Sequence, residues 1–223
     1  MTETGRTRLK FAVMCNSLVL QKWQAEALDI LVSSGKATPV LLIMRMSETG
    51  TKRGFLKRLI SYSWTKLLFK KYYQYFFRPV TFRHESIRQM ADGIPQIQCK
   101  TMLKGKYSEH FLPDDLKTIR DYQPDFILKF GFGILRGDIL NAAPYGIWSF
   151  HHGDEQKYRG IPPAFYEIML NDHITGSVLQ RLTETLDGGI ILRKGYFPTI
   201  NHSWRANLDQ AIQLSIRWPL EVC

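Results

Sequence analysis

Apolar and polar residues recur along the chain with two different periods, which predict strands and helices in turn. Short apolar runs at Leu9–Met14 and Pro39–Met44 are typical of buried strands. Between them, apolar residues recur at the spacing of one helix face, at Trp23, Ala27, Leu28 and Leu31, before a stop at Gly35. A strand, a helix and a second strand in this order predict a β-α-β unit with two parallel strands.

The rest of the chain extends this pattern and predicts an α/β fold with a mostly parallel central sheet and flanking helices. Further strands are expected at Ile94–Cys99, Pro124–Phe130, Ile147–Phe150, Gly176–Leu182 and Ile190–Phe197, the last two as a hairpin. Further helices are expected at Pro113–Arg120, at Arg136–Ala143, from Ala164 onward, and at Trp204–Val222. The length of 223 residues predicts one domain, 1–223. The last helix stops at Cys223 without a cap, so we expect the protein to continue beyond it.

A polar loop rich in titratable side chains follows the strand that ends near Phe150. Successive side chains of a strand point to opposite faces, so Ser149 and His151 should share one face and Phe150 and His152 the other. The ionisable candidates near strand ends are His151, His152, Asp154, Glu155, Glu184 and Asp187. From spacing alone, Asp187 before two glycines fits a plain turn as well as a reaction centre.

The whole chain has a net charge of +10, and the excess positive charge is concentrated in one segment. Residues 49–84 contain no acidic residue and nine basic ones: Lys52, Arg53, Lys57, Arg58, Lys66, Lys70, Lys71, Arg78 and Arg83. Their spacing predicts a basic amphipathic helical insertion at about 50–84. Residues 52–78 could be a core-packing helix with a solvated lysine face, or a surface that binds an anionic membrane, RNA or a nucleotide-linked substrate.

Several classes of protein are disfavoured by the sequence. No basic, then apolar, signal segment begins the chain, and no run of eighteen apolar residues could span a membrane. The cysteines Cys15, Cys99 and Cys223 are too scattered for a disulfide framework or a metal site, which indicates a cytoplasmic location. The basic segment adds a peripheral position at the inner membrane surface as a second option. No dinucleotide-binding glycine motif follows the first strand, so NAD is not expected.

Between Pro124 and Phe197, several motifs occur in an order that resembles the formyltransferase family. These are Pro124–Ile127, Tyr145–Ile147, His151, Tyr158–Pro163, Thr175–Val178 and Leu186–Ile191. The family includes methionyl-tRNA, glycinamide ribonucleotide and amino-sugar formyltransferases, which use 10-formyltetrahydrofolate. The resemblance implies a Rossmann-like formyltransferase fold.

The resemblance also implies roles for individual residues. His151 would be the catalytic histidine and Asp187 the catalytic aspartate, while the backbone of two loops would hold the pterin ring: Phe130, Gly131, Phe132, Gly133, Ile134 and Leu135, with Glu184, Thr185 and Leu186. Where the family pattern has an oxyanion-binding asparagine, this chain has Ser149. Losing one such donor typically lowers a rate by about a hundred- to a thousand-fold.

The expected activity is transfer of a formyl group from 10-formyltetrahydrofolate to a primary amine, with an amino sugar as the preferred acceptor. A methionyl-tRNA acceptor is the alternative, since the basic segment lies where those enzymes place a tRNA-contacting insertion. A catalytically impaired protein that binds an anionic surface is the competing class, because of Ser149 and the basic segment. The sequence gives no indication of oligomeric state.

Overall fold

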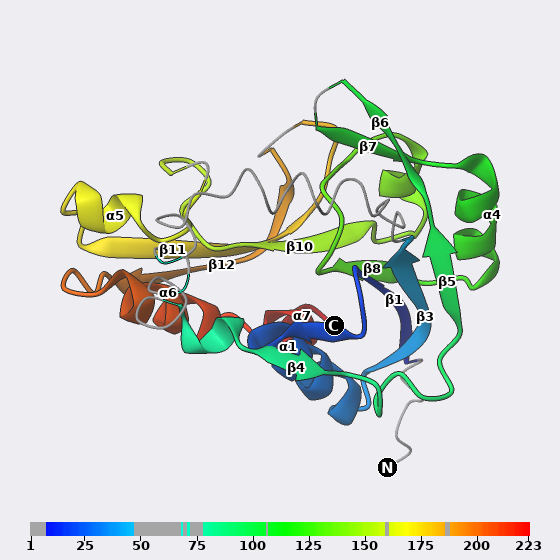
Figure 1. The fold of residues 1–223 in the computed structure, drawn as a ribbon, viewed down its shortest axis with the longest axis horizontal. Helices are drawn as coiled ribbons and strands as arrows, with labels where there is room; N and C mark the ends of the chain where they lie inside the picture. The colour runs from blue at the N-terminus through cyan, green and yellow to red at the C-terminus, as the bar shows by residue number, and fades with distance from the viewer. Residues whose placement is uncertain are drawn as a thin grey trace, which may run out of the picture.

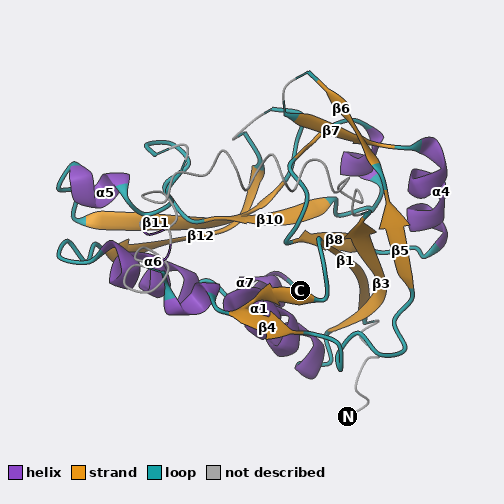
Figure 2. Ribbon diagram, viewed as in Figure 1, coloured by secondary structure: helices purple, strands orange, loops and turns teal. Residues whose placement is uncertain are grey.

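The computed structural model of the chain describes residues 8–46, 68, 71, 78–105, 107–158, 161–185 and 188–223. A seven-stranded sheet crosses the molecule (Figures 1 and 2), with neighbouring strands in the order β12-β11-β10-β8-β1-β3-β5. In chain order the strands are β1 (Leu9–Cys15), β3 (Ala37–Arg45), β5 (Gln96–Cys99), β8 (Phe126–Lys129), β10 (Ile147–His151), β11 (Ile174–Arg181) and β12 (Ile190–Pro198). Most of the predicted basic insertion lies outside the described residues.

Five neighbouring strands pair in parallel, and the two strands at one edge are joined by antiparallel pairing. β1 pairs in parallel with both β3 and β8, and β10 continues this arrangement beside β8. β11 pairs antiparallel with β10 and β12, as the expected hairpin requires. The chain order reverses between β1 and β8, and ligands of such sheets bind at the carboxyl ends of the strands beside such a reversal. The mostly parallel α/β sheet is therefore confirmed.

Apolar residues of β1 alternate between the two faces of the sheet and divide the core in two. Phe11 and Val13 belong to one buried cluster, which includes Leu28 of the helix α1 (Lys22–Ser33). Ala12 and Met14 belong to the other, which includes residues of α4 (Pro113–Asp121). The helices α6 (Trp204–Gln213) and α7 (Trp218–Val222) lie near α1 in Figure 1. Helices on both faces are expected for a parallel sheet, because both of its faces must be buried.

Three of the predicted helices are shorter than their apolar pattern suggested. Only a 3-10 turn, η2 (Asp138–Asn141), forms within the helix expected at Arg136–Ala143, because Gly137 has a φ of 78° that no helix accommodates. The helix expected from Ala164 is the single turn α5 (Tyr166–Met169), since Ala164 itself has a φ of 55°. The C-terminal helix is divided into α6 and α7 between Gln213 and Trp218.

Two small sheets were not predicted. The strands β2 (Val19–Gln21) and β4 (His84–Ser86) pair antiparallel beside α1, together with a 3-10 turn, η1 (Val80–Phe82). The strands β6 (Thr101–Lys104), β7 (Ser108–Phe111) and β9 (Ile134–Leu135) form a three-stranded sheet. The second of these matters for the site, because β7 lies directly beside the loop that follows β8.

Candidate active site

The two faces of β10 separate its polar side chains as the alternation predicts. Phe150 and His152 both pack against Trp23 of α1, with ring centroids 5.2 and 5.1 Å from the indole. Ile147 belongs to the cluster on the opposite face, so Ser149 and His151 also lie on that face. The hydroxyl and the second imidazole therefore project from the same side at the carboxyl end of the strand.

The adjacent histidines have different environments. Burial, together with the neighbouring His151, lowers the pKa of His152 to about 3, so this ring is neutral and has the character of a packed aromatic group. The Nε2 atom of His151 is also buried, and it makes no hydrogen bond to any residue that the structure describes. Gly153 lies so close that a Cβ there would be 3.3 Å from this atom. Both ring nitrogens of His152 are likewise buried without a partner among the described residues, so the two rings differ in their surroundings: His152 packs among aromatic rings, and His151 projects from the face that carries Ser149.

The predicted aspartate and one predicted folate contact lie outside the described residues. These are Asp187 and Leu186, together with Arg159 and Gly160 of the Tyr158–Pro163 motif. The pairing of His151 with Asp187 therefore stays a prediction.

The loop after β8 is anchored to the ends of neighbouring strands. Asn16 Oδ1, just after β1, accepts a hydrogen bond from the Phe132 amide at 3.0 Å. A Cβ on Gly131 would lie 2.7 Å from the carbonyl carbon of Cys15 and 2.8 Å from the Asn16 nitrogen, so only glycine fits there. This loop consequently meets the end of β1 at the point where the strand order reverses.

An ion pair between the buried Glu109 and the half-buried Arg45 holds the next residue of the loop, Gly133. Glu109 of β7 accepts hydrogen bonds from the Gly133 amide at 3.0 Å and from Thr101 Oγ1 at 3.2 Å. The Arg45 guanidinium donates to both oxygens of Glu109, at 2.7 and 2.8 Å, and its centre lies 4.7 Å from the centroid of the Phe132 ring. Both of these hydrogen bonds come from the one nitrogen Nη2, and together they hold the carboxylate against the guanidinium.

The second predicted loop lies against the first. Glu184 accepts a hydrogen bond from the Gly137 amide at 2.8 Å, and Arg136 donates to the Thr183 carbonyl at 3.3 Å. Between the two loops is a cavity of about 130 Å³, lined by Lys129, Gly133, Ile134, Leu135, Arg136, Gln180, Leu182, Thr183 and Thr185. The structure thus brings together the two loops that the resemblance assigned to the pterin ring.

A row of three polar residues crosses the sheet at this cavity. Ser149 of β10 is in register with Lys129 of β8 on one side and with Gln180 of β11 on the other. Lys129 and Gln180 line the cavity, and Gln180 Oε1 is buried with no hydrogen-bond partner among the described residues. Burial lowers the pKa of the Lys129 ammonium; the nearby Glu109 carboxylate opposes this effect, and Arg45 adds to it.

The residues predicted to contact the cofactor have different positions. Gly133, Ile134, Leu135 and Thr185 line the cavity. Gly131 lies against the end of β1, Phe132 stacks on Arg45, and Glu184 caps Gly137. Phe130 instead packs edge-on against Trp23, on the face of the sheet opposite to Ser149 and His151. Lys129, Gln180 and Glu109 were not singled out from the sequence. Only Lys129 gave a signal, as a single charge within the apolar run Phe126–Phe130.

The acidic residues that follow His152 form a structural cluster. Lys194 of β12 donates to Asp154 and to Glu155, each at 3.0 Å, and all three side chains are largely buried. This ion-pair network joins the loop after β10 to the edge strand. Asp154 and Glu155 therefore have a structural role, which is to fix the position of this loop.

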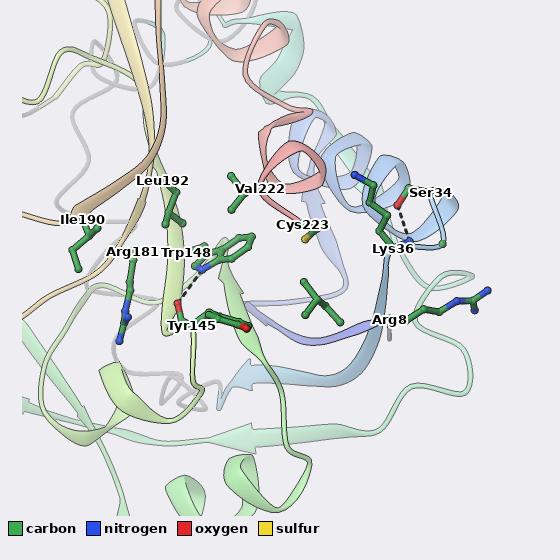
Figure 3. A pocket seen from close by; sticks show the side chains of 12 residues that line it. Arg8, Ser34, Lys36, Tyr145, Trp148, Arg181, Ile190, Leu192, Val222 and Cys223 are labelled. Atoms are coloured by element: carbon green, nitrogen blue, oxygen red, sulfur yellow. Dashed lines mark hydrogen bonds between the residues drawn. The ribbon is translucent and has the colours of Figure 1, made fainter. Parts of the chain in front are cut away.

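A larger cavity lies near the amino ends of β1 and β10, at the other end of the parallel strands from the predicted site residues. Its volume is about 680 Å³, and Figure 3 shows Trp148, Leu192, Val222 and Cys223 around it, with the basic residues Arg8, Lys36 and Arg181 at its margin. Trp148 donates its indole N–H to the Tyr145 carbonyl there, at 3.0 Å. None of the residues predicted for catalysis or for folate binding lines this cavity.

Among the described residues, no cluster of three histidine, cysteine or acidic side chains is arranged to hold a metal ion. No helix in the described part of the chain is long and apolar enough to cross a membrane.

The fold and the two facing loops define a class, the Rossmann-like formyltransferase fold. Phosphoribosylglycinamide formyltransferase from Campylobacter jejuni superposes with a TM-score of 0.59 at 13% identity, over 96% of this chain and 97% of that one. A formyltetrahydrofolate deformylase from Pseudomonas syringae pv. tomato superposes with a TM-score of 0.58 at 13% identity, over 96% of this chain and 62% of that one.

Sequence comparison leads to the same family. No family model matches the chain. Methionyl-tRNA formyltransferase from Xanthomonas campestris pv. campestris is 31% identical over 104 residues, which are 46% of this chain and 31% of the relative. That from Borreliella afzelii is 35% identical over 78 residues, 34% of this chain and 25% of the relative. The chain thus spans no more than about a third of these curated relatives, and the resemblance to the formyltransferase family is confirmed.

Proposed function

We propose that this protein transfers a formyl group from 10-formyltetrahydrofolate to a primary amine. The observation that carries the proposal is the position of His151 and the 130 Å³ cavity at the carboxyl edge of a sheet with the formyltransferase fold. The relatives named above act, by their names, on methionyl-tRNA, on phosphoribosylglycinamide or on formyltetrahydrofolate itself.

The cavity suits a flat polar ring. Cavities that hold a whole drug-sized ligand measure about 300–1,000 Å³, so 130 Å³ has room for one ring system only, with the rest of the donor outside. Gln180 Oε1, which has no partner among the described residues, is an acceptor for a ring N–H, because a buried polar atom without a partner is costly until a ligand pairs with it.

The bound donor would supply an activated formyl carbon. The acceptor nitrogen bonds to this carbon while the bond from the carbon to the donor nitrogen breaks; the acceptor nitrogen loses one proton, and the donor nitrogen gains one. His151 Nε2 is the group that moves this proton, since an imidazole can both accept and donate a proton. Asp187 orients and charges the imidazole, and the Ser149 hydroxyl donates to the formyl oxygen as negative charge develops there.

The identity of the formyl acceptor is the more specific part of the proposal. We retain an amino sugar as the first candidate, although none of the relatives reported above is named for one. Methionyl-tRNA is favoured by the names of the sequence relatives and by the nine basic residues between Thr49 and His84. Water as acceptor, which would make the protein a deformylase, is favoured by one structural neighbour.

One assay separates these acceptors. The protein is mixed with 10-formyltetrahydrofolate and either a panel of amino-sugar nucleotides, charged initiator tRNA, or buffer alone, and the release of tetrahydrofolate is followed. His151→Ala and Asp187→Asn should abolish release, whereas His202→Ala, at an exposed histidine of the loop before α6, should not change it. No release under any condition, together with no binding of folate in calorimetry, would refute the enzymatic function and favour a binding protein built on this fold.

A further inference from the structure

The ammonium of Lys129 is a partly buried cation with no assigned partner. Lys129 occupies the last position of β8, lines the 130 Å³ cavity, and makes no hydrogen bond or ion pair that the structure records among the described residues. Glu109, whose carboxylate favours the charged form of Lys129, is engaged by Arg45, Thr101 and the Gly133 amide. Lys129 is half-buried, and a partly desolvated charge without an ion partner is costly, so its retention at a ligand cavity is an indication of function.

The register of the sheet places this cation beside the reacting groups. Lys129 of β8 is paired directly with Ser149 of β10. His151 lies two residues after Ser149, on the same face of β10. Neighbouring strands lie about 4.8 Å apart, so a small group bound over Ser149 is within reach of the lysine side chain. Acyl transfer requires donors or positive charge at the oxygen that becomes negative.

We propose that Lys129 is a catalytic residue that stabilises, together with Ser149, the negative charge that develops on the formyl oxygen during transfer. This inference rests on the proposed function. A single serine hydroxyl supplies one short-range hydrogen bond, whereas an ammonium in a partly desolvated site also supplies a full charge and further N–H donors. The lysine thus provides what an asparagine amide would provide at position 149.

The alternative role for Lys129 is binding of a permanent anion on the donor. The position of the residue argues against that role, because Lys129 is one member of the row Lys129, Ser149 and Gln180 that crosses the sheet at a cavity with room for one ring system. The two roles differ in what they change: stabilisation of the oxyanion affects the rate of the chemical step, and binding of a permanent anion affects donor affinity.

The test compares Lys129→Met with wild type in three measurements. In single turnover with 10-formyltetrahydrofolate and the acceptor found in the panel, Lys129→Met should react about a hundred- to a thousand-fold more slowly. Binding of tetrahydrofolate, measured by calorimetry, should change by less than threefold. The variant should also melt at a higher temperature, because a desolvated cation is replaced by an apolar side chain of similar length. Lys117→Met, at an exposed lysine of α4, is the matched control and should be unchanged throughout.

Two further variants separate charge from shape. Lys129→Arg keeps the positive charge and should retain most of the rate. Ser149→Asn, introduced into Lys129→Met, restores an amide donor and should recover at least tenfold of the lost rate.

Each of four results would overturn the inference. Turnover of Lys129→Met within threefold of an active wild type would remove the catalytic role while leaving the proposed function standing. Loss of tetrahydrofolate binding with a normal rate at saturation would make Lys129 a donor-binding residue. A slow variant that also melts at a lower temperature would show a structural role. If wild type itself releases no tetrahydrofolate under any condition, the proposed function and this inference fail together.

Discussion

Replacing Glu109 by alanine should both destabilise the protein and loosen the loop that borders the candidate site. The carboxylate is 6% exposed and accepts four hydrogen bonds, two from Arg45, one from Thr101 Oγ1 and one from the Gly133 amide. Breaking a buried ion pair by removing one partner costs about 3–5 kcal/mol. The Arg45 side chain is 35% exposed, so water offsets part of this cost and we expect a loss of about 2–3 kcal/mol.

The measurement is urea unfolding followed by tryptophan fluorescence, with calorimetry as a second method. A loss of this size in a chain of 223 residues corresponds to a decrease of about 5–10 °C in Tm. Glu109→Gln should lose less than Glu109→Ala, because an amide oxygen still accepts from Gly133. In a double-mutant cycle with Arg45→Ala, the coupling free energy should be about 1.5–3 kcal/mol. Both Glu109 variants should bind tetrahydrofolate more weakly.

Glu184→Ala is the matched control on the other side of the same loop. Its side chain is 64% exposed although it accepts from the Gly137 amide at 2.8 Å, so we expect a loss under about 1 kcal/mol. The reasoning would be refuted if Glu109→Ala cost no more than Glu184→Ala, or if the cycle gave a coupling free energy near zero.

Three further predictions concern buried groups around the site. His152→Phe should make the free energy of unfolding less dependent on pH in acid. Because the folded state keeps His152 neutral, wild type loses up to about 1.4 kcal/mol per pH unit as pH falls from about 6.5 towards 3. Unfolding titrations at several pH values measure this loss. Burial raises the pKa of Glu167, and Asp172 and Asp154 add to the shift. Glu167→Gln should therefore be more stable than wild type at pH 7 and equally stable below pH 4, and an equal difference in stability at both pH values would contradict this. Gly131→Ala places a Cβ 2.7 Å from backbone that cannot move aside, and should cost about 1–3 kcal/mol and weaken donor binding in calorimetry.

The regular parts of the sheet could be predicted because their side chains follow the core. In β1 the apolar residues face both core clusters, as a parallel strand covered by helices requires, and its run is apolar throughout. In β10 the alternation placed Ser149 and His151 on one face, which the packing of Phe150 and His152 on Trp23 confirms. Such elements are determined by local pattern and burial together, so the sequence contains both signals.

The irregular parts depend on contacts that no local pattern contains. The apolar residues at Arg136–Ala143 have a helical appearance, but the Gly137 amide is bound by Glu184, 47 residues later, and only a 3-10 turn remains. Tertiary contacts override helix propensity in this way. Lys129 likewise looks like the end of an apolar strand, and its relation to Ser149 follows from the pairing of β8 with β10, which is a property of the assembled sheet.

Glu109 connects the stability of the loop with the charge of the proposed catalytic lysine. Its carboxylate anchors Gly133 and also favours the charged form of Lys129, whereas Arg45 opposes that form. Removing Glu109 therefore leaves Arg45 unbalanced and lowers the pKa of Lys129 further, so that the ammonium is lost at a lower pH than in wild type. Loosening of the loop slows turnover equally at every pH, whereas loss of the lysine charge slows it at alkaline pH alone. Since arginine at position 129 stays charged, only the second effect disappears in a Glu109→Gln, Lys129→Arg double variant.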